Sequence, residues 1–202
     1  MNQTINKQEL FALLKKQNGC LGNMGLIVNE PIMFEHTNLN FPTLDAKIAL
    51  GDTIFQKLVV FGGKKSILKN IFLEDSKFES FVKLEGVGLK DFRCDQAIFE
   101  EEVTCNGISL SMFDCGKAKF KKAFKALDSK FGGFYCAEPT FEEEFLSFST
   151  IFLGNFYCGK ATFKKGITLN EAAHTKFEGF FIAPNHPELA KQILYYKQGI
   201  II

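Results

Sequence analysis

Four cysteines recur along the chain at an almost constant interval. Cys94, Cys115, Cys136 and Cys158 are separated by 21, 21 and 22 residues, and each follows a phenylalanine by two positions. A fixed period of this length indicates a repeat architecture, in which each unit stacks on the one before it. The sequence therefore predicts a stack of units of about 21 residues each.

Apolar residues within a unit come in pairs whose members are two positions apart. In one unit the pairs are Phe92/Cys94, Ala97/Phe99, Val103/Cys105 and Ile108/Leu110. Residues two apart in a β-strand point to the same side, so each pair predicts a short strand with inward side chains. Four such strands, separated by tight turns, make one roughly square coil. Stacked coils would pair as parallel strands about 4.8 Å apart.

Three segments of the repeat follow a small-x-Phe pattern: Ala97-Ile98-Phe99, Ala118-Lys119-Phe120 and Ala161-Thr162-Phe163. This pattern resembles the core of the pentapeptide-repeat family, in its Phe-rich branch. The resemblance covers residues 76–170 and is weaker over residues 32–75. It implies a right-handed quadrilateral β-helix, so we expect an all-β solenoid of about seven coils. The chain departs from the family pattern in two ways: half the faces put the large residue first, and one step per coil has six residues.

The two ends of the chain break the repeat and are predicted to cap it. Residues 1–23 are expected to form an N-terminal capping helix, with Asn6 and Glu9 at the spacing of a capping box. Residues 24–182 are the predicted β-helix, and residues 183–202 the C-terminal capping and dimerisation segment, which contains a short helix. Such caps are needed because the bare end of a solenoid invites pairing with other chains.

The rhythm of the repeat blurs near Gly62 and Gly63. Upstream of this point Phe34, Phe41, Phe55 and Phe61 keep the composition of the repeat, but their spacing is irregular. Adjacent glycines permit positive φ, so we expect a bulge or an extruded loop here.

The repeated cysteines are predicted to be small buried core residues. Zinc requires four ligands that converge on one point, whereas stacked coils would place Cys94, Cys115, Cys136 and Cys158 in a line. Cys105 belongs to the opposite face and is interpreted in the same way, while Cys20 lies outside the repeat. Nearly all of the 24 phenylalanines fall on inward positions, which favours an aromatic core over a platform that stacks nucleic-acid bases. We expect no metal, no cofactor and no catalytic group.

Charged residues cluster at one corner of four successive coils. The clusters are Glu100, Glu101 and Glu102; Lys121 and Lys122; Glu142, Glu143 and Glu144; and Lys164 and Lys165. Acidic and basic corners therefore alternate along one predicted edge. One interpretation is a ladder that sets register and solubility, and the other is a recognition edge for a partner of mixed charge. The net charge of +1 and the pI near 7.6 disfavour direct nucleic-acid binding.

The C-terminal segment carries more apolar side chains than one solenoid end needs. The residues predicted to meet a second copy in a two-fold homodimer are Leu189, Ile193, Leu194, Tyr195 and Tyr196. The alternative is a monomer whose tail is used entirely in capping.

Three functions remain open from the sequence. The first is a non-enzymatic interaction scaffold with an unknown protein partner. The second comes from the resemblance, which implies a DNA-mimicking binder of DNA gyrase or topoisomerase IV, and this mechanism needs a strongly acidic rod. The third is a ligand-binding or enzymatic cleft at a cap, near His174, which falls where Phe152 stands in the preceding coil unless the register slips there. We expect a cytoplasmic protein with reduced cysteines and no membrane span.

Overall fold

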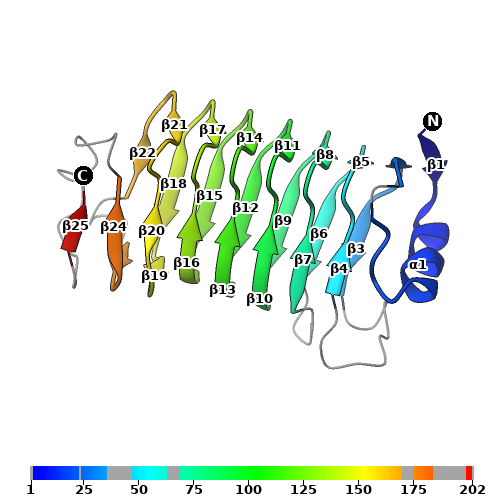
Figure 1. The fold of residues 1–202 in the computed structure, drawn as a ribbon, viewed down its shortest axis with the longest axis horizontal. Helices are drawn as coiled ribbons and strands as arrows, with labels where there is room; N and C mark the ends of the chain where they lie inside the picture. The colour runs from blue at the N-terminus through cyan, green and yellow to red at the C-terminus, as the bar shows by residue number, and fades with distance from the viewer. Residues whose placement is uncertain are drawn as a thin grey trace.

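Parallel strands stack along one axis to form a β-solenoid (Figure 1). A computed structural model describes residues 2–22, 24–35, 47–62, 69–169, 175–183 and 199–201. Within these residues the strands form three sheets that run the length of the rod, and the helix α1 (Lys7–Lys16) lies at its N-terminal end. The predicted all-β solenoid of about seven coils is confirmed.

Sheet A carries the small-x-Phe segments. Its described strands, in spatial order, are β1 (Gln3–Ile5), β2 (Leu26–Val28), β5 (Thr53–Phe55), β8 (Lys77–Phe78), β11 (Ile98–Phe99), β14 (Lys119–Phe120), β17 (Thr140–Phe141) and β21 (Thr162–Phe163). Neighbouring strands pair in parallel and in register, so Phe99 is opposite Phe120 and Phe120 is opposite Phe141. The period of 21 residues in the central coils is therefore confirmed.

Sheet C follows sheet A along each coil. Its described strands are β3 (Ile32–Phe34), β6 (Val59–Gly62), β9 (Val82–Glu85), β12 (Val103–Asn106), β15 (Phe124–Leu127), β18 (Phe145–Phe148) and β22 (Ile167–Thr168). Gly62 is the last residue of β6 and lies opposite Glu85, without a positive φ. A Cβ at this position would lie 2.3 Å from the carbonyl oxygen of Glu85. Gly62 is thus explained by close backbone approach and not by the positive φ that we expected. The expected bulge or extruded loop falls on residues 63–68, which lie outside the described part, and remains a prediction.

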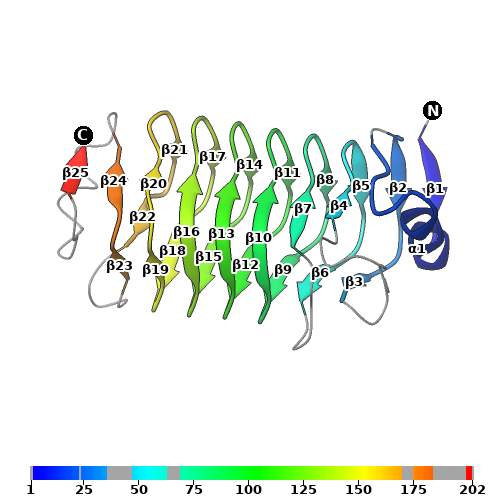
Figure 2. The ribbon, with the colours of Figure 1, turned by 60° about the horizontal axis from the view of Figure 1, so that its bottom comes forward.

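Sheet B supplies the remaining two sides of each coil (Figure 2). Its main path runs through β4 (Lys47–Ala49), β7 (Asn70–Phe72), β10 (Gly88–Arg93), β13 (Ser109–Asp114), β16 (Lys130–Tyr135), β20 (Phe156–Tyr157), β24 (Phe180–Ile182) and β25 (Gly199–Ile201), and β19 (Ile151–Phe152) and β23 (Lys176–Phe177) lie off this path. In β10 the buried residues Leu89 and Phe92 are three apart, so the strand bends around a corner without interruption. Two of the four predicted strands are therefore merged in the central coils. The extra residue of the 22-residue interval separates them again as β19 and β20.

Columns of identical side chains fill the interior. Along sheet A the rings of Phe55, Phe78, Phe99, Phe120, Phe141 and Phe163 stack with centroids 4.7 to 5.0 Å apart and interplanar angles of 4° to 6°. Phe163 is half-buried, whereas the other five rings are buried. Parallel pairing fixes this spacing, because each ring extends from a backbone that lies one strand away from the next.

The register shifts by three residues near the C-terminal end. Phe152 is opposite Phe177, so His174 does not continue this column as we had expected. The hydroxyl of Thr175 donates a hydrogen bond to the carbonyl of Ser147, as that of Thr150 does to the carbonyl of Ala126. The pair Thr175/Phe177 therefore replaces the predicted pair Ala172/His174. His174 itself lies outside the described residues.

The N-terminal cap combines a strand with the predicted helix. β1 pairs in parallel with β2 and extends sheet A by one strand, which the sequence pattern did not predict. The capping box of α1 is confirmed, since the Asn6 side chain accepts from the Glu9 amide at 2.9 Å and the Glu9 carboxylate accepts from the Asn6 amide at 2.8 Å. Leu10 and Leu14 are buried against the first coils. The predicted C-terminal helix lies outside the described residues, and β25 adds a strand to sheet B beyond β24.

Candidate functional site

The charged clusters predicted on one edge stack there as a row. In each coil a three-residue connection joins sheet A to sheet C, and in four successive coils these connections are residues 100–102, 121–123, 142–144 and 164–166. We call this set the charged corner. Backbone hydrogen bonds fix it at both ends: the Lys121 amide donates to the Phe99 carbonyl at 2.9 Å, and the Val103 amide donates to the Ala123 carbonyl at 3.1 Å. The sign of the charge consequently alternates from each of these four connections to the next.

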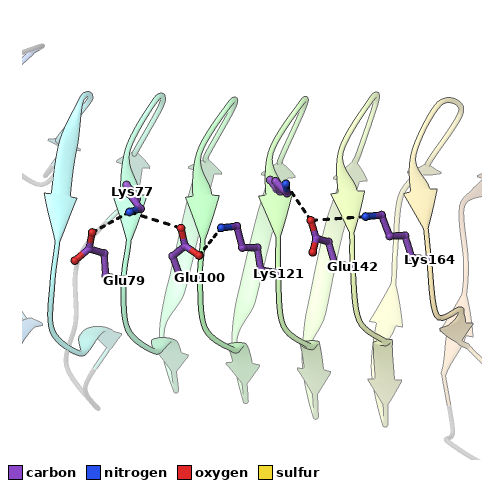
Figure 3. A network of polar contacts seen from close by, with 7 residues as sticks. Lys77, Glu79, Glu100, Lys121, Glu142 and Lys164 are labelled. Carbon is purple, nitrogen blue, oxygen red and sulfur yellow. Dashed lines mark hydrogen bonds and ion pairs between the residues drawn. The ribbon is translucent and has the colours of Figure 1, made fainter.

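The first residues of the connections form a ladder of ion pairs (Figure 3). Glu100 lies 2.6 Å from Lys121 and 3.6 Å from Lys77, measured from carboxylate oxygen to Nζ. Glu142 is bound at 3.0 Å by Lys119, which comes from strand β14, and at 3.8 Å by Lys164. Each of these two glutamates therefore lies between two lysines.

The ion pairs lower the pKa of the glutamates in this ladder. The hydrogen bond from Lys121 is the largest cause of the lowered pKa of Glu100, and the hydrogen bond from Lys119 has the same effect on the pKa of Glu142. The pKa of Glu79 is lowered by its hydrogen bond from Lys77. These carboxylates consequently keep their charge in mildly acidic solution, and the alternation of charge persists with them.

Three charged side chains of the corner make no ion pair with any described residue. Glu143 is bound by Lys165 at 3.0 Å, and Glu102 by Lys125 at 2.6 Å. Glu101, Lys122 and Glu144 have no such partner within 4 Å among the described residues. Their charges are thus available to a molecule outside the chain.

These side chains line a groove along the edge of the rod. Its volume is about 540 Å³, and its walls are Phe81, Glu101, Glu102, Lys122, Ala123, Glu143, Glu144 and Lys165. Phe81 is one of these wall residues and is 48% exposed, which is unusual in a chain whose other phenylalanines are mostly buried. Charged side chains that surround a hollow, together with an exposed aromatic ring, are suited to non-covalent binding of another macromolecule.

The repeated cysteines are core residues, as predicted. Cys94, Cys115, Cys136 and Cys158 are buried, and each thiol is free. The thiol of Cys136 donates to the carbonyl oxygen of Tyr157 at 3.0 Å. Burial strongly raises the pKa of Cys94, Cys105 and Cys136, so these thiols stay protonated and unreactive. Among the described residues, no group of three or more histidine, cysteine or acidic side chains is arranged to hold a metal ion.

A second group of charges lies at another corner and was missed from the sequence. Asp95, between sheets B and A, has a raised pKa because of burial, then because of the negative charges of Asp114 and Glu74. Arg93 and Lys117 oppose this shift only in part. Here acidic side chains follow one another in neighbouring coils, so the alternation at the charged corner is not general.

The sequence identified the corner but not all of its ion pairs. Lys77 and Lys119 come from the strands, at the outward position directly before a buried phenylalanine. Strand alternation was the available signal, since a residue next to an inward phenylalanine must face outward. The five predicted dimer contacts, residues 189 and 193–196, lie outside the described residues, so that interpretation remains a prediction. His36 and His186, which the sequence predicts as turn or cap residues, also lie outside the described residues.

Comparisons with protein-family models, with curated proteins and with solved structures find nothing that matches the chain. No helix in the described part is long and apolar enough to span a membrane.

Proposed function

We propose that this protein is a non-enzymatic interaction scaffold, and that the charged corner is the surface that binds a protein partner. The observation that carries the proposal is the groove of about 540 Å³ at the corner, which presents Glu101, Lys122 and Glu144 without ion pairs to any described residue. Such charges can form ion pairs with a partner without breaking those that the structure describes. Complementary charges at an interface favour the correct partner and speed association.

Rigidity of the rod supports the proposal. The strands that border the corner are paired in register on both sides, and their phenylalanines are stacked and buried. A surface that is ordered before binding loses little conformational freedom when the partner arrives. The corner is therefore a preorganised row of charges at a fixed spacing.

We also propose that the chain is a divergent member of the pentapeptide-repeat family. Support comes from the stacked small-x-Phe segments of sheet A, with Ala97, Ala118 and Ala161 buried beside the phenylalanine column. The six-residue step that departs from the family pattern is the step that contains the charged corner.

A binding experiment with matched variants tests the scaffold proposal. The wild type and two variants are immobilised and exposed to an extract of the source cells. One variant neutralises the corner with Glu101→Gln, Lys122→Gln and Glu144→Gln. The control neutralises the ion pair between Glu138 and Lys160, which lies at a different corner with a separation of 3.3 Å. We expect proteins that bind the wild type and the control but not the corner variant. Identical binding to all three chains would rule out the charged corner as the binding surface.

The DNA-mimic alternative predicts a different result. Lysines interrupt the acidic residues at every second step of the charged corner, so this edge does not imitate a continuous row of phosphates. We expect the wild type not to inhibit supercoiling by DNA gyrase or decatenation by topoisomerase IV. Strong inhibition would favour the alternative.

A further inference from the structure

The charge pattern of the corner changes sign when its direction is reversed. The second residues of the four connections are Glu101, Lys122, Glu143 and Lys165, with charges minus, plus, minus, plus. Read from the other end, the order is plus, minus, plus, minus. An even number of alternating charges therefore opposes its own reversed copy with opposite charges at every position.

We propose that the occupant of the charged corner is a second copy of this chain, in antiparallel orientation about a two-fold axis between residues 121–123 and 142–144. The inference rests on the proposed function, since it names the partner for the same surface. In this arrangement Glu101 faces Lys165 of the second copy, and Lys122 faces Glu143 of the second copy. Each contact occurs twice, as in any isologous interface.

The first residues of the connections obey the same rule. Glu100, Lys121, Glu142 and Lys164 also alternate in sign, so the two-fold axis places Glu100 opposite Lys164 and Lys121 opposite Glu142. These charges already form ion pairs within the chain. A second copy would surround each of them with opposite charges on several sides, which satisfies a charge better than a single ion pair.

The third residues supply complementary size. They are Glu102, Ala123, Glu144 and Gly166, which alternate between large and small. The same axis places Glu144 over Ala123 and Glu102 over Gly166. Ala123, Glu102 and Glu144 line the groove, so each hollow left by a small residue receives a glutamate of the second copy. Charge and shape are thus complementary about one axis.

The outward side chains of the flanking sheets are electrostatically compatible with this contact. On sheet A the outward residues beside the corner are Ile98, Lys119, Thr140 and Thr162, and the axis pairs Ile98 with Thr162 and Lys119 with Thr140. On sheet C it pairs Thr104 with Thr168 and Lys125 with Leu146. No like charges meet at any of these positions.

A parallel arrangement of two copies is excluded by the same pattern. A two-fold axis along the rod would place each connection opposite the same connection of the second copy, so that Glu101 meets Glu101 and Lys122 meets Lys122. A shift by one coil would restore opposite charges but would leave unpaired ends that continue to add copies. The antiparallel contact is the one that is both closed and complementary.

The contact is expected to be weak and sensitive to salt. Its ion pairs lie at an exposed edge, where dissolved ions screen them. The homodimer predicted through residues 183–202 would be apolar and would survive in concentrated salt. Salt dependence therefore distinguishes the two modes of self-association.

Charge reversal among the second residues of the four connections tests the proposal. An acidic variant carries Lys122→Glu and Lys165→Glu, and a basic variant carries Glu101→Lys and Glu143→Lys. An inverted variant carries all four changes and restores alternation with the opposite sign. The first residues of the connections are left unchanged because their ion pairs stabilise the coils. Circular dichroism confirms that each variant is folded.

Sedimentation equilibrium measures the association of each chain up to a concentration of about 1 mM. We expect the wild type to dimerise, with at least about tenfold weaker association when salt rises from about 0.05 to 0.5 M. The acidic and basic variants should each associate at least about tenfold more weakly than the wild type, and their equimolar mixture should recover a heterodimer. The inverted variant should match the wild type.

Several outcomes would overturn the self-association. They are a wild type that stays monomeric in low salt, a dimer that is indifferent to salt, acidic and basic variants that dimerise as the wild type does, or an inverted variant that fails to dimerise. If the wild type is monomeric but neutralising the charged corner still abolishes binding of other proteins, self-association is ruled out and the scaffold proposal is supported. A dimer whose corner binds nothing else would support self-association alone.

Discussion

The interior and the corners of this solenoid are stacked by the same parallel pairing, yet they follow opposite rules for neighbours. Inside, like residues lie on like residues, as in the column of Phe99, Phe120 and Phe141. At the charged corner, unlike residues follow one another, so that Glu100 lies beside Lys121. Stacking places residues at equivalent positions of neighbouring coils in direct contact. Identical apolar side chains stabilise each other in such contacts, whereas charged side chains do so only where neighbours have opposite signs.

The corner around Asp95 shows what happens when this requirement is not met. The pKa of Asp95 is raised first by burial and further by the negative charges of Asp114 and Glu74, which have the same sign and lie near it. At the charged corner the pKa of Glu100 is lowered instead. The pKa values of the two carboxyls are thus shifted in opposite directions, and the sign of the neighbouring charges contributes to both shifts.

The largest expected effect comes from breaking an interior column. Phe120→Ala removes a buried ring whose centroid lies 4.8 Å from that of Phe99 and 4.7 Å from that of Phe141. We expect the free energy of unfolding to fall by about 3–5 kcal/mol, as for other buried aromatics. Chemical denaturation measures the loss.

The neighbouring outward residue provides the control for this measurement. Lys119→Ala removes an exposed ion pair, so it should cost less than about 1 kcal/mol. Similar losses for Lys119→Ala and Phe120→Ala would contradict the distinction between interior and surface.

The regular part of the fold could be predicted from the sequence because its period is almost constant. Every coil between Phe78 and Phe163 repeats the order of inward and outward residues, and a one-residue error would turn buried phenylalanines to solvent. The stacked columns of phenylalanine and cysteine followed from this, as did the place of the charged corner. These are consequences of local spacing.

Other features depend on contacts that spacing does not reveal. The three-residue shift before Phe177 and the pairing of β1 with β2 are set by neighbouring coils and not by the local pattern. The long side chains of Lys77 and Lys119 reach glutamates of adjacent coils. The position of Asp95 beside Asp114 likewise depends on how neighbouring coils stack, which the local spacing does not reveal.

A smaller loss of stability is expected at a corner where the backbone conformation, and not a side-chain contact, is the feature that a substitution disturbs. Gly107 has a φ of +61°, and a Cβ there would have no neighbour within 4 Å. Gly107→Ala should therefore lower the free energy of unfolding by about 1–2 kcal/mol through backbone strain alone. Gly88→Ala is the matched control, since that site is equally open but has no positive φ. Equal effects of the two changes in thermal unfolding would argue against strain as the cause.

Reversal of a charge would turn the charged corner into a column of like signs. Lys121→Glu replaces an ion pair of 2.6 Å with repulsion from Glu100, and we expect a loss of about 1 kcal/mol in dilute salt. Lys122→Glu should cost less, because Lys122 has no ion pair among the described residues. Both losses should shrink in concentrated salt, where screening weakens exposed charges. Unfolding curves at two salt concentrations test this, and an effect that does not change with salt would contradict the electrostatic explanation.

The smallest effect on stability is expected when the charge of Asp95 is removed from among its like-charged neighbours. Because the folded state raises the pKa of Asp95, ionisation of this carboxyl destabilises the fold as pH rises through that pKa. Asp95→Asn should therefore stabilise the protein by less than about 1 kcal/mol at neutral pH, and its advantage should vanish below about pH 4, where the carboxyl is protonated in both states. Glu100→Gln should behave in the opposite way, because the lowered pKa of Glu100 adds stability that is lost as pH falls through it. Denaturation of both variants from acidic to neutral pH measures the two slopes, and slopes of the same sign would show that the two corners do not differ as the structure indicates.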